Sequence, residues 1–248
     1  MNFIDIHCHL ERYENFEKII ENARTRDVKI ILAQGINVET NRIVLKLAEK
    51  YPEVKVCLGI YPIDALKMSD KEINSEIEFI RKNKNKIAGI GEVGIDFKED
   101  LNEHERQKKV FRKFVQLSMD LDIPIIVHSR KAEKEGIEIL EEMKAEKVIM
   151  HCFCGNRKLE ERIIKNGWYL TIPTSVTRSQ QFQERAKNCP IEQLFCETDS
   201  PFLHPDKIGE NEPANVMRAY EKIAEIRGMK LEEVKKKIWE NFEKLFSS

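Results

Sequence analysis

The sequence predicts an α/β protein of the (β/α)8 class, a single-domain TIM barrel with an additional C-terminal helix. Short, almost continuously apolar segments alternate with amphipathic helical segments, a pattern typical of a parallel sheet buried on both faces. The alternation repeats eight times within 248 residues, which matches the usual size of a closed barrel. No linker, low-complexity tract or internal repeat interrupts it, so we expect one domain over residues 1–248. The alternative architecture is a doubly wound open sheet.

The expected strands are short apolar runs, several of them rich in β-branched residues. In chain order they cover residues 3–10, 28–33, 54–59, 87–92, 123–128, 147–151, 168–172 and 193–199. Each run is followed by apolar residues spaced three and four positions apart, which predicts an amphipathic helix. These helices are centred on residues 16–23, 44–51, 69–80, 110–121, 137–140, 159–163, 182–186 and 213–223, and a last one covers 234–245. Ser69 suits an N-cap and Pro213 a first helical turn.

Composition excludes several classes of protein. Hydrophobic residues make up 41% of the chain, but no apolar run is long enough to span a membrane and no signal peptide is visible, so we expect no membrane association. The six cysteines include no CxxC pair and mostly lie inside apolar runs, which favours reduced thiols and a cytoplasmic location. The formal net charge is −1 with no basic tail, so binding of nucleic acid would need a local patch.

Potential metal ligands stand at the carboxyl ends of five expected strands. His7 and His9 are two residues apart at the end of the first strand, so their side chains point to the same face. In a barrel all these strand ends lie on one face, where such enzymes place their active sites. The full set is His7, His9, Glu92, His128, His151 and Asp199.

Four imidazoles and two carboxylates are too many ligands for one ion and suit two divalent ions. Glu92 can bridge the ions with its two oxygens, and Asp199 can act both as a ligand and as the acceptor of a proton from water, so these two residues are the candidate catalytic residues. Nitrogen-rich ligation favours zinc, manganese, iron or cobalt, with magnesium a weaker candidate and calcium disfavoured.

Six segments together resemble the TatD family of metal-dependent deoxyribonucleases, which belongs to the amidohydrolase-like barrels. They are IDIHCHL at 4–10, GEVGIDF at 91–97, VHSR at 127–130, HCFCG at 151–155, ETDSP at 197–201 and NEP at 211–213. The resemblance implies that His7, His9 and Asp199 hold one ion, His128 and His151 the other, with Glu92 between them. It also implies a DNA substrate. We expect single-stranded ends to be favoured, because a narrow cleft at a barrel mouth admits one unpaired strand, and no obligate protein partner is evident.

The chain departs from the commoner family pattern at two places. Tyr61 and Ile63 stand where many members have histidines, and Glu210 stands where many have an arginine. Neither place carries a proposed ligand, but both bear on how a phosphate-bearing substrate is held.

Four further residues are candidates for contacting the substrate. Arg130 can fork onto a phosphate or pair with a nearby acid. Asp96 can orient a ligand histidine or cap its loop. His204 can overhang the site or lie in a solvated loop, and Asn211 belongs to the NEP segment.

We therefore expect a metal-dependent hydrolase that cleaves DNA phosphodiester bonds with a water activated by two metal ions. The nuclease assignment comes from the resemblance, because the spacing of the ligands indicates two-metal hydrolysis alone. One alternative is an amidohydrolase-like esterase, lactonase or aminoacyl-tRNA ester hydrolase with the same site. Another is a catalytically silent protein that binds metal or nucleic acid, which the complete ligand set argues against.

Overall fold

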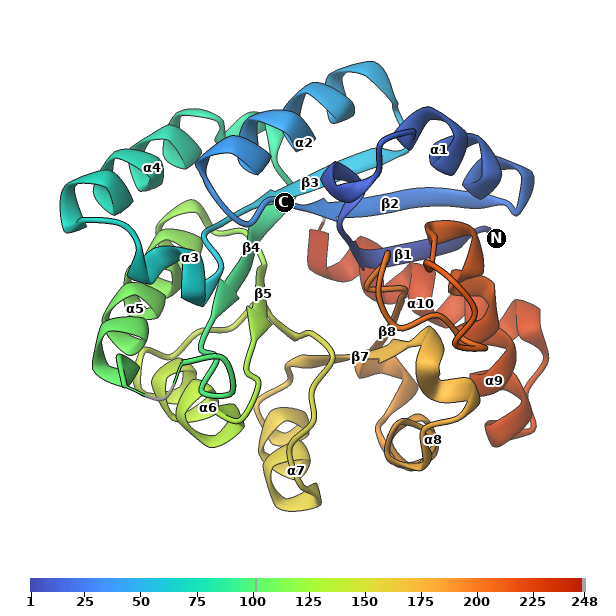
Figure 1. Cartoon of the computed structure of the whole chain (residues 1–248). Coiled ribbons are helices and arrows are strands. Elements are labelled where there is room, and N and C mark those ends of the chain that lie inside the picture. The colour runs from blue at the N-terminus through green and yellow to red at the C-terminus, as the bar shows by residue number, and fades with distance from the viewer. Residues whose placement is uncertain (101, 247–248) are drawn as a thin grey trace.

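The computed structural model of this chain describes residues 1–100 and 102–246. Residues 101, 247 and 248 of the expected domain lie outside the described residues. Figure 1 shows strands gathered at the centre of the molecule and helices around them, in the order of the chain.

Eight parallel strands form one sheet in the order β1-β2-β3-β4-β5-β6-β7-β8. They are β1 Phe3–Cys8, β2 Val28–Gln34, β3 Val54–Leu58, β4 Gly89–Gly94, β5 Ile125–His128, β6 Val148–Met150, β7 Tyr169–Pro173 and β8 Leu194–Glu197. Almost every strand residue is buried, as expected for strands covered by the barrel interior on one side and by helices on the other.

Helices connect and surround the strands. The α-helices are α1 Phe16–Thr25, α2 Val38–Lys50, α3 Pro62–Leu66, α4 Asp70–Lys82, α5 His104–Leu121, α6 Glu133–Glu142, α7 Arg157–Lys165, α8 Gln180–Asn188, α9 Met217–Arg227 and α10 Leu231–Phe246. Short 3-10 helices are η1 Leu10–Arg12, η2 Lys84–Lys86, η3 Thr174–Thr177, η4 Ile191–Gln193 and η5 Pro213–Val216. Ser69 caps α4 in a capping box with Glu72, as its position predicts.

Backbone hydrogen bonds join the first strand to the end of the last. The amide of Asp199 donates to the carbonyl of His7 at 2.9 Å, and the amide of His9 donates to the carbonyl of Ser200 at 2.8 Å. Cys8 and Ser200 form a parallel bridge at the same place. These bonds bring β8 back to β1, so the predicted barrel is confirmed and the open sheet is not.

The structure differs from the sequence-based expectation mainly at element boundaries. The first strand ends at Cys8, because η1 begins at Leu10. The short helix α3 was not expected, since its five residues are too few to show a periodic pattern. Pro213 begins the 3-10 helix η5, and α9 starts only at Met217. Among the described helices, none is long and apolar enough to cross a membrane.

Candidate metal centre

The six predicted ligands lie together at the carboxyl ends of the strands. We call them the strand-end cluster: His7, His9, Glu92, His128, His151 and Asp199. The strands themselves carry three of these side chains, and the other three follow within two residues of a strand. The fold therefore places all six at one end of the barrel, as predicted.

The junction of β1 and β8 holds His7, His9 and Asp199, which we call the seam half of the cluster. The Nε2 atoms of His7 and His9 lie 3.4 Å apart, and each lies 3.6 Å from Oδ1 of Asp199. Both imidazoles are buried, whereas the side chain of Asp199 is 15% exposed. The same backbone bonds that close the barrel therefore assemble these three side chains.

Asp5 reinforces the seam half from inside the barrel. Its Oδ1 accepts a hydrogen bond of 2.8 Å from the amide of Thr198, and its Oδ2 lies 2.5 Å from Oγ1 of Thr198. Burial raises the pKa of Asp5 to about 8, against the lowering effect of these hydrogen bonds. A neutral Asp5 thus bridges β1 to the residue before Asp199.

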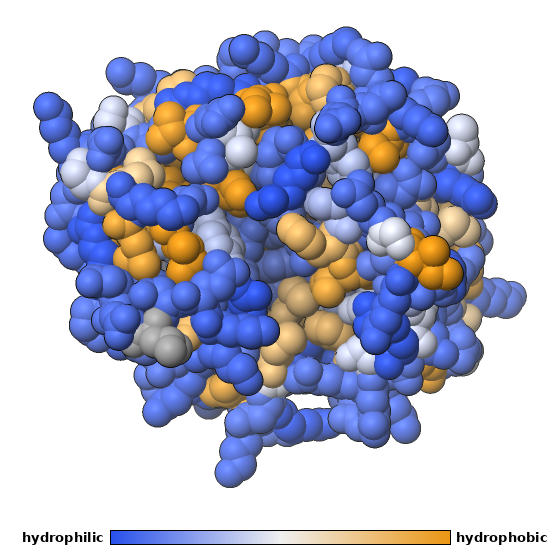
Figure 2. All heavy atoms as spheres, viewed as in Figure 1, coloured by the Kyte–Doolittle hydropathy of each residue, from blue (hydrophilic) through white to orange (hydrophobic). Residues whose placement is uncertain are grey.

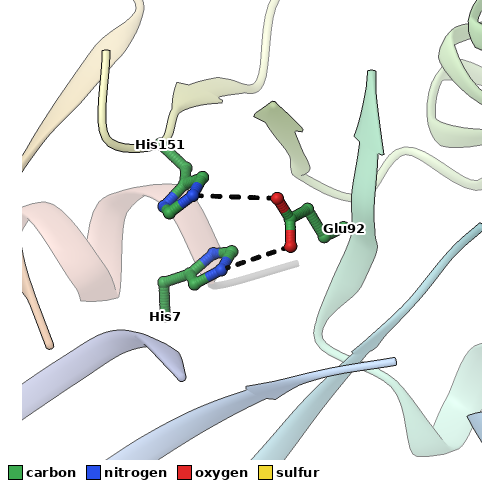
Figure 3. Close-up of side chains that lie close together, drawn as sticks. All are labelled: His7, Glu92 and His151. Carbon is green, nitrogen blue, oxygen red and sulfur yellow. Dashed lines mark ion pairs between the residues drawn. The ribbon is translucent and has the colours of Figure 1, made fainter. Parts of the chain in front are cut away.

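Glu92 points its two carboxylate oxygens in different directions. Oε2 lies 3.6 Å from Nε2 of His7 and 3.4 Å from Nε2 of His9. Oε1 lies 2.8 Å from Nδ1 of His128 and 3.7 Å from Nε2 of His151. Figure 3 shows Glu92 facing His7 and His151 at once. This is the arrangement that a bridging carboxylate requires.

His128 lies in the second part of the site, which we call the wall half and which also contains Asp96, Tyr61 and Arg130. Oδ2 of Asp96 lies 2.9 Å from Nε2 of His128 and accepts hydrogen bonds of 2.8 Å from the Tyr61 hydroxyl and from Nε of Arg130. Glu99 pairs with the same guanidinium. The sequence left open whether Arg130 binds a phosphate or pairs with an acid. In the structure it pairs with two acids, Asp96 and Glu99.

Asp96 has both of the contacts considered for it from the sequence. It faces His128 as described, and its Oδ1 also accepts hydrogen bonds of 2.9 and 3.0 Å from the amides of Lys98 and Glu99. The side chain is fully buried, so it fixes the position of the His128 imidazole relative to the loop after β4.

His151 connects the two halves. Its ring stacks on that of His7, with centroids 3.6 Å apart and planes 8° apart. Its Nδ1 lies 2.9 Å from Oε2 of Glu197, a buried carboxylate of β8. The other nitrogen, Nε2, is left facing Glu92.

The carboxylates determine where protons are held in this cluster. Burial raises the pKa of Glu92, but hydrogen bonds with His128, His7 and His9 outweigh it and hold the pKa well below its usual value. Burial lowers the pKa of His151, but Glu197 and other carboxylates outweigh it and raise the pKa to about 10. The carboxylates thus keep protons on His151, His9 and His128, whereas burial and the neighbouring His151 lower the pKa of His7. A divalent ion held by the same atoms replaces such protons, so metal binding should release them.

The ligand atoms fit divalent ions in two overlapping groups. Atoms of His7, Glu92 and His151 lie within 4.8 Å of one another, as do atoms of His7, His9 and Asp199. Nδ1 of His7 is buried without a hydrogen-bond partner among the described residues, whereas Nδ1 of His9 lies 3.3 Å from Oε1 of Glu11. The donor set of imidazole nitrogen and carboxylate oxygen suits a transition metal. His128 belongs to neither group, because its nitrogens face Glu92 and Asp96.

A cleft of about 580 Å³ opens above the cluster. The residues that line it beyond the cluster include Arg12, Ile36, Tyr61, Lys67, Arg130, Phe202 and Leu203. Figure 2 shows the face of the molecule seen in Figure 1, which is hollowed near its middle and has both apolar and polar residues around the hollow. The volume is typical of sites for small organic groups.

The remaining candidates from the sequence lie away from the cleft lining. Nδ1 of His204 accepts hydrogen bonds from the amides of Asp206 and Ile208, within its own loop. Asn211 is fully buried, and its side-chain amide donates to Thr174 and to the carbonyl of Thr198. Asn211 does not line the cleft. Its hydrogen bonds instead stabilise the loop after β8.

The two departures from the family pattern differ in their location. Tyr61 and Ile63 line the cleft, and the Tyr61 hydroxyl lies 3.4 Å from Nε2 of His128. Glu210 is exposed and is not among the cleft-lining residues. The change at Tyr61 and Ile63 is therefore the one that bears on substrate.

Sequence reasoning missed three acidic residues that support the cluster. Oε1 of Glu11 lies 3.3 Å from Nδ1 of His9. Glu197 contacts Nδ1 of His151, and Asp5 accepts a hydrogen bond from the amide of Thr198 beside the seam half. A signal for them exists: Asp5, His7, His9 and Glu11 occupy every second position, as do Glu197 and Asp199. Such alternation indicates one shared face of a strand.

Comparison with known proteins agrees with this fold. The family model of TatD related DNase matches residues 4–247. A putative deoxyribonuclease, TATDN3 of Mus musculus, is 34% identical, with 99% of this chain and 88% of that protein covered. An uncharacterized metal-dependent hydrolase of Methanocaldococcus jannaschii is 35% identical, covering 99% of this chain and 97% of that protein.

A solved structure extends the likeness to three dimensions. The crystal structure of YjjV, a TatD homolog from Escherichia coli, superimposes with a TM-score of 0.92 at 25% sequence identity. The match covers 99% of this chain and 98% of that one.

Proposed function

This chain belongs to the TatD related DNase family of metal-dependent hydrolases, and on that premise we propose that it hydrolyses phosphodiester bonds of DNA at a centre of two divalent ions. We assign the centre to the six residues of the strand-end cluster and the catalytic unit to one domain over residues 1–248. The observation that carries the proposal is the meeting of two ligand groups at His7, with Glu92 facing both halves of the cluster.

The ligand set divides in the way two ions would need. His7, His9 and Asp199 would hold the first ion, and His151 with His128 would hold the second, with one oxygen of Glu92 toward each. Divalent ions in such a site polarise a phosphoryl oxygen and lower the pKa of water. Zinc, manganese, iron and cobalt fit the nitrogen-rich set better than magnesium.

Asp199 would accept the proton that water loses on attack. It is the most exposed carboxylate of the cluster, and it lines the cleft. Burial raises its pKa, but His151, His9 and His7 outweigh this effect and hold the pKa below its usual value. Asp199 is therefore ionised at neutral pH, as a general base must be.

DNA is favoured as the substrate by the relatives' names and by the cleft. The human relative is named deoxyribonuclease TATDN3 and is 32% identical. The cleft lining includes the cations Arg12, Lys67 and Arg130, which can replace counterions on phosphates. Its volume suits an unpaired strand end better than a duplex. The free thiols of all six cysteines support a cytoplasmic location.

One assay separates this function from its alternatives. End-labelled single strands, the matching blunt duplex, aminoacyl-tRNA, and a panel of small esters and lactones would be incubated with manganese-loaded protein, with and without chelator. We expect the single strands to be degraded fastest, chelator to stop the reaction and added salt to slow it. Intact DNA beside chelator-sensitive turnover of an ester or lactone would assign the same centre to another substrate. No turnover of any substrate would indicate a silent binding protein.

A further inference from the structure

Phe202 is an exposed aromatic residue beside the strand-end cluster. Its side chain is 47% exposed, and it is the one aromatic residue among the exposed large hydrophobic residues of the described chain. It lines the cleft, and its amide donates a hydrogen bond of 2.9 Å to the carbonyl of Asp199. The turn that follows Asp199 thus fixes an apolar ring at the mouth of the cleft. Because the ring is not buried, core packing does not explain why an aromatic residue stands there.

The ring is held in place but remains open on part of its surface. The imidazole of His9 meets it edge to face, with centroids 6.1 Å apart and planes 71° apart. The guanidinium carbon of Arg12 lies 5.3 Å from the ring centroid. Nearly half of the Phe202 surface is nevertheless exposed, which leaves room for another planar group.

Arg12 carries the least neutralised charge of the three cations that line the cleft. Arg130 is bound by Asp96 and Glu99, and Lys67 lies 3.1 Å from Asp64. Arg12 has one contact with an acid in the described chain, at 3.9 Å from Glu11, whose carboxylate is closer to His9. Of these three side chains, Arg12 is therefore the one most available to an anion that enters the cleft, and it lies beside Phe202.

We propose that Phe202 and Arg12 form a subsite for one unpaired nucleotide, with the base stacked on Phe202 and its phosphate on Arg12. The proposal rests on the proposed function, since it names the part of the DNA that the cleft recognises. Stacking is indifferent to base identity, because every base has a π-face, so the subsite selects unpaired over paired nucleotides and not one sequence over another. A paired terminal base cannot use the ring without leaving its partner.

The test uses binding as well as turnover. Short strands with phosphorothioate linkages would carry the fluorescent base 2-aminopurine at the 5′ or the 3′ end, and would be added to manganese-loaded protein. We expect quenching of one of the two probes by wild type and by Phe202→Trp. Phe202→Leu keeps an apolar side chain without a π-face, so it should lose the quenching and bind the strand about 5- to 150-fold more weakly. Arg12→Gln should lower the salt dependence of binding by the equivalent of about one phosphate contact.

The matched control is another arginine–phenylalanine pair, which lies outside the cleft. The guanidinium of Arg42 lies 3.6 Å from the ring of Phe79 on α4. Phe79→Leu should bind and quench like wild type. Unchanged quenching and affinity in Phe202→Leu, with DNA still bound and cleaved, would overturn the subsite and leave the nuclease intact. Failure of wild type to bind or cleave any strand would overturn the proposed function, and the subsite with it.

Discussion

The two halves of the strand-end cluster are built in different ways. The two imidazoles of the seam half are buried, and this half is assembled by the backbone bonds that close the barrel, with Asp5 as an internal brace. The wall half is held by side chains instead, because His128 and Arg130 both contact the buried carboxylate of Asp96, and Arg130 is 37% exposed. The seam half is therefore fixed by the fold, whereas the wall half can exchange partners.

This difference implies unequal roles for the two proposed ions. In the seam half, the facing atoms of two imidazoles and a carboxylate lie 3.4–3.6 Å apart, so an ion there would replace long contacts only. In the wall half, an ion that uses Nδ1 of His128 must displace its 2.8 Å contact with Glu92. We expect the seam site to bind the tighter ion and the wall site to bind a weaker, exchangeable ion next to the substrate.

The largest expected effect is that of His7→Ala, because His7 belongs to both ligand groups. Turnover should fall to the level of chelated wild type. The variant should keep a cooperative thermal transition, with an unfolding free energy lowered by about 1–3 kcal/mol for a buried side chain. His104→Ala is the control. His104 lies at the start of α5, its imidazole stacks on Phe97, and it does not line the cleft. An insoluble His7→Ala protein, beside a well-folded metal-free wild type, would show that the seam is structural.

Asp199→Asn tests whether the seam half also provides the base. The amide keeps one oxygen for a metal but cannot accept the proton, so the rate at saturating metal should fall by about 10²–10⁴-fold. The matched control is Asp206→Asn in the same loop, where the carboxylate pairs with Arg218 at the surface. A rate within a few-fold of wild type at saturating metal would assign the base to another group.

Asp96→Asn tests the wall half alone. Removal of this charge should let His128 turn and should weaken the second ion, or the activity that depends on it, by about 10–100-fold. The first ion should bind as in wild type. Asp100→Asn provides the comparison, because its carboxylate accepts a hydrogen bond from the amide of Glu103 and does not contact His128. Equal loss of both ions in Asp96→Asn would contradict the division into halves.

A smaller effect is expected from the brace of the seam half. Asp5 has a pKa of about 8 in the folded chain against 3.8 ordinarily, so between these values the folded state binds a proton that the unfolded state lacks. The contribution of Asp5 to the free energy of unfolding is therefore complete below pH 3.8. It is lost as pH rises toward 8, by up to about 1.4 kcal/mol per pH unit. Denaturant unfolding of metal-free protein at several pH values should show a shallower decline for Asp5→Asn. Parallel pH curves would contradict this.

Much of the fold could be predicted because period and length are local properties. Runs such as 54–59 and 123–128 can only be buried strands when they alternate with amphipathic helices, and β3 and β5 lie within them. The boundaries were less predictable, because α3 and η5 are set by the chain packing over the strand ends. Closure between His7 and Asp199 is a contact between distant parts of the chain and has no local signature.

The sequence could predict which residues gather at the candidate site, but not which of them contact one another. Strand-end positions predicted that all six residues of the cluster lie on one face, because parallel strands end on one face. The pairing of Arg130 with Asp96 and Glu99, and the inward location of Asn211, depend on which side chains meet across loops. The roles of individual ligands stay predictions that the metal and kinetic measurements decide.

Titration of metal-free protein with manganese tests the unequal two-ion centre most directly. Calorimetry with elemental analysis should show close to two ions per chain in wild type, one bound more tightly than the other and both with proton release. His128→Ala should retain the tight ion and lose the weak one, whereas His9→Ala should lose the tight one. A single class of equal sites, or loss of the tight ion in His128→Ala, would contradict the account.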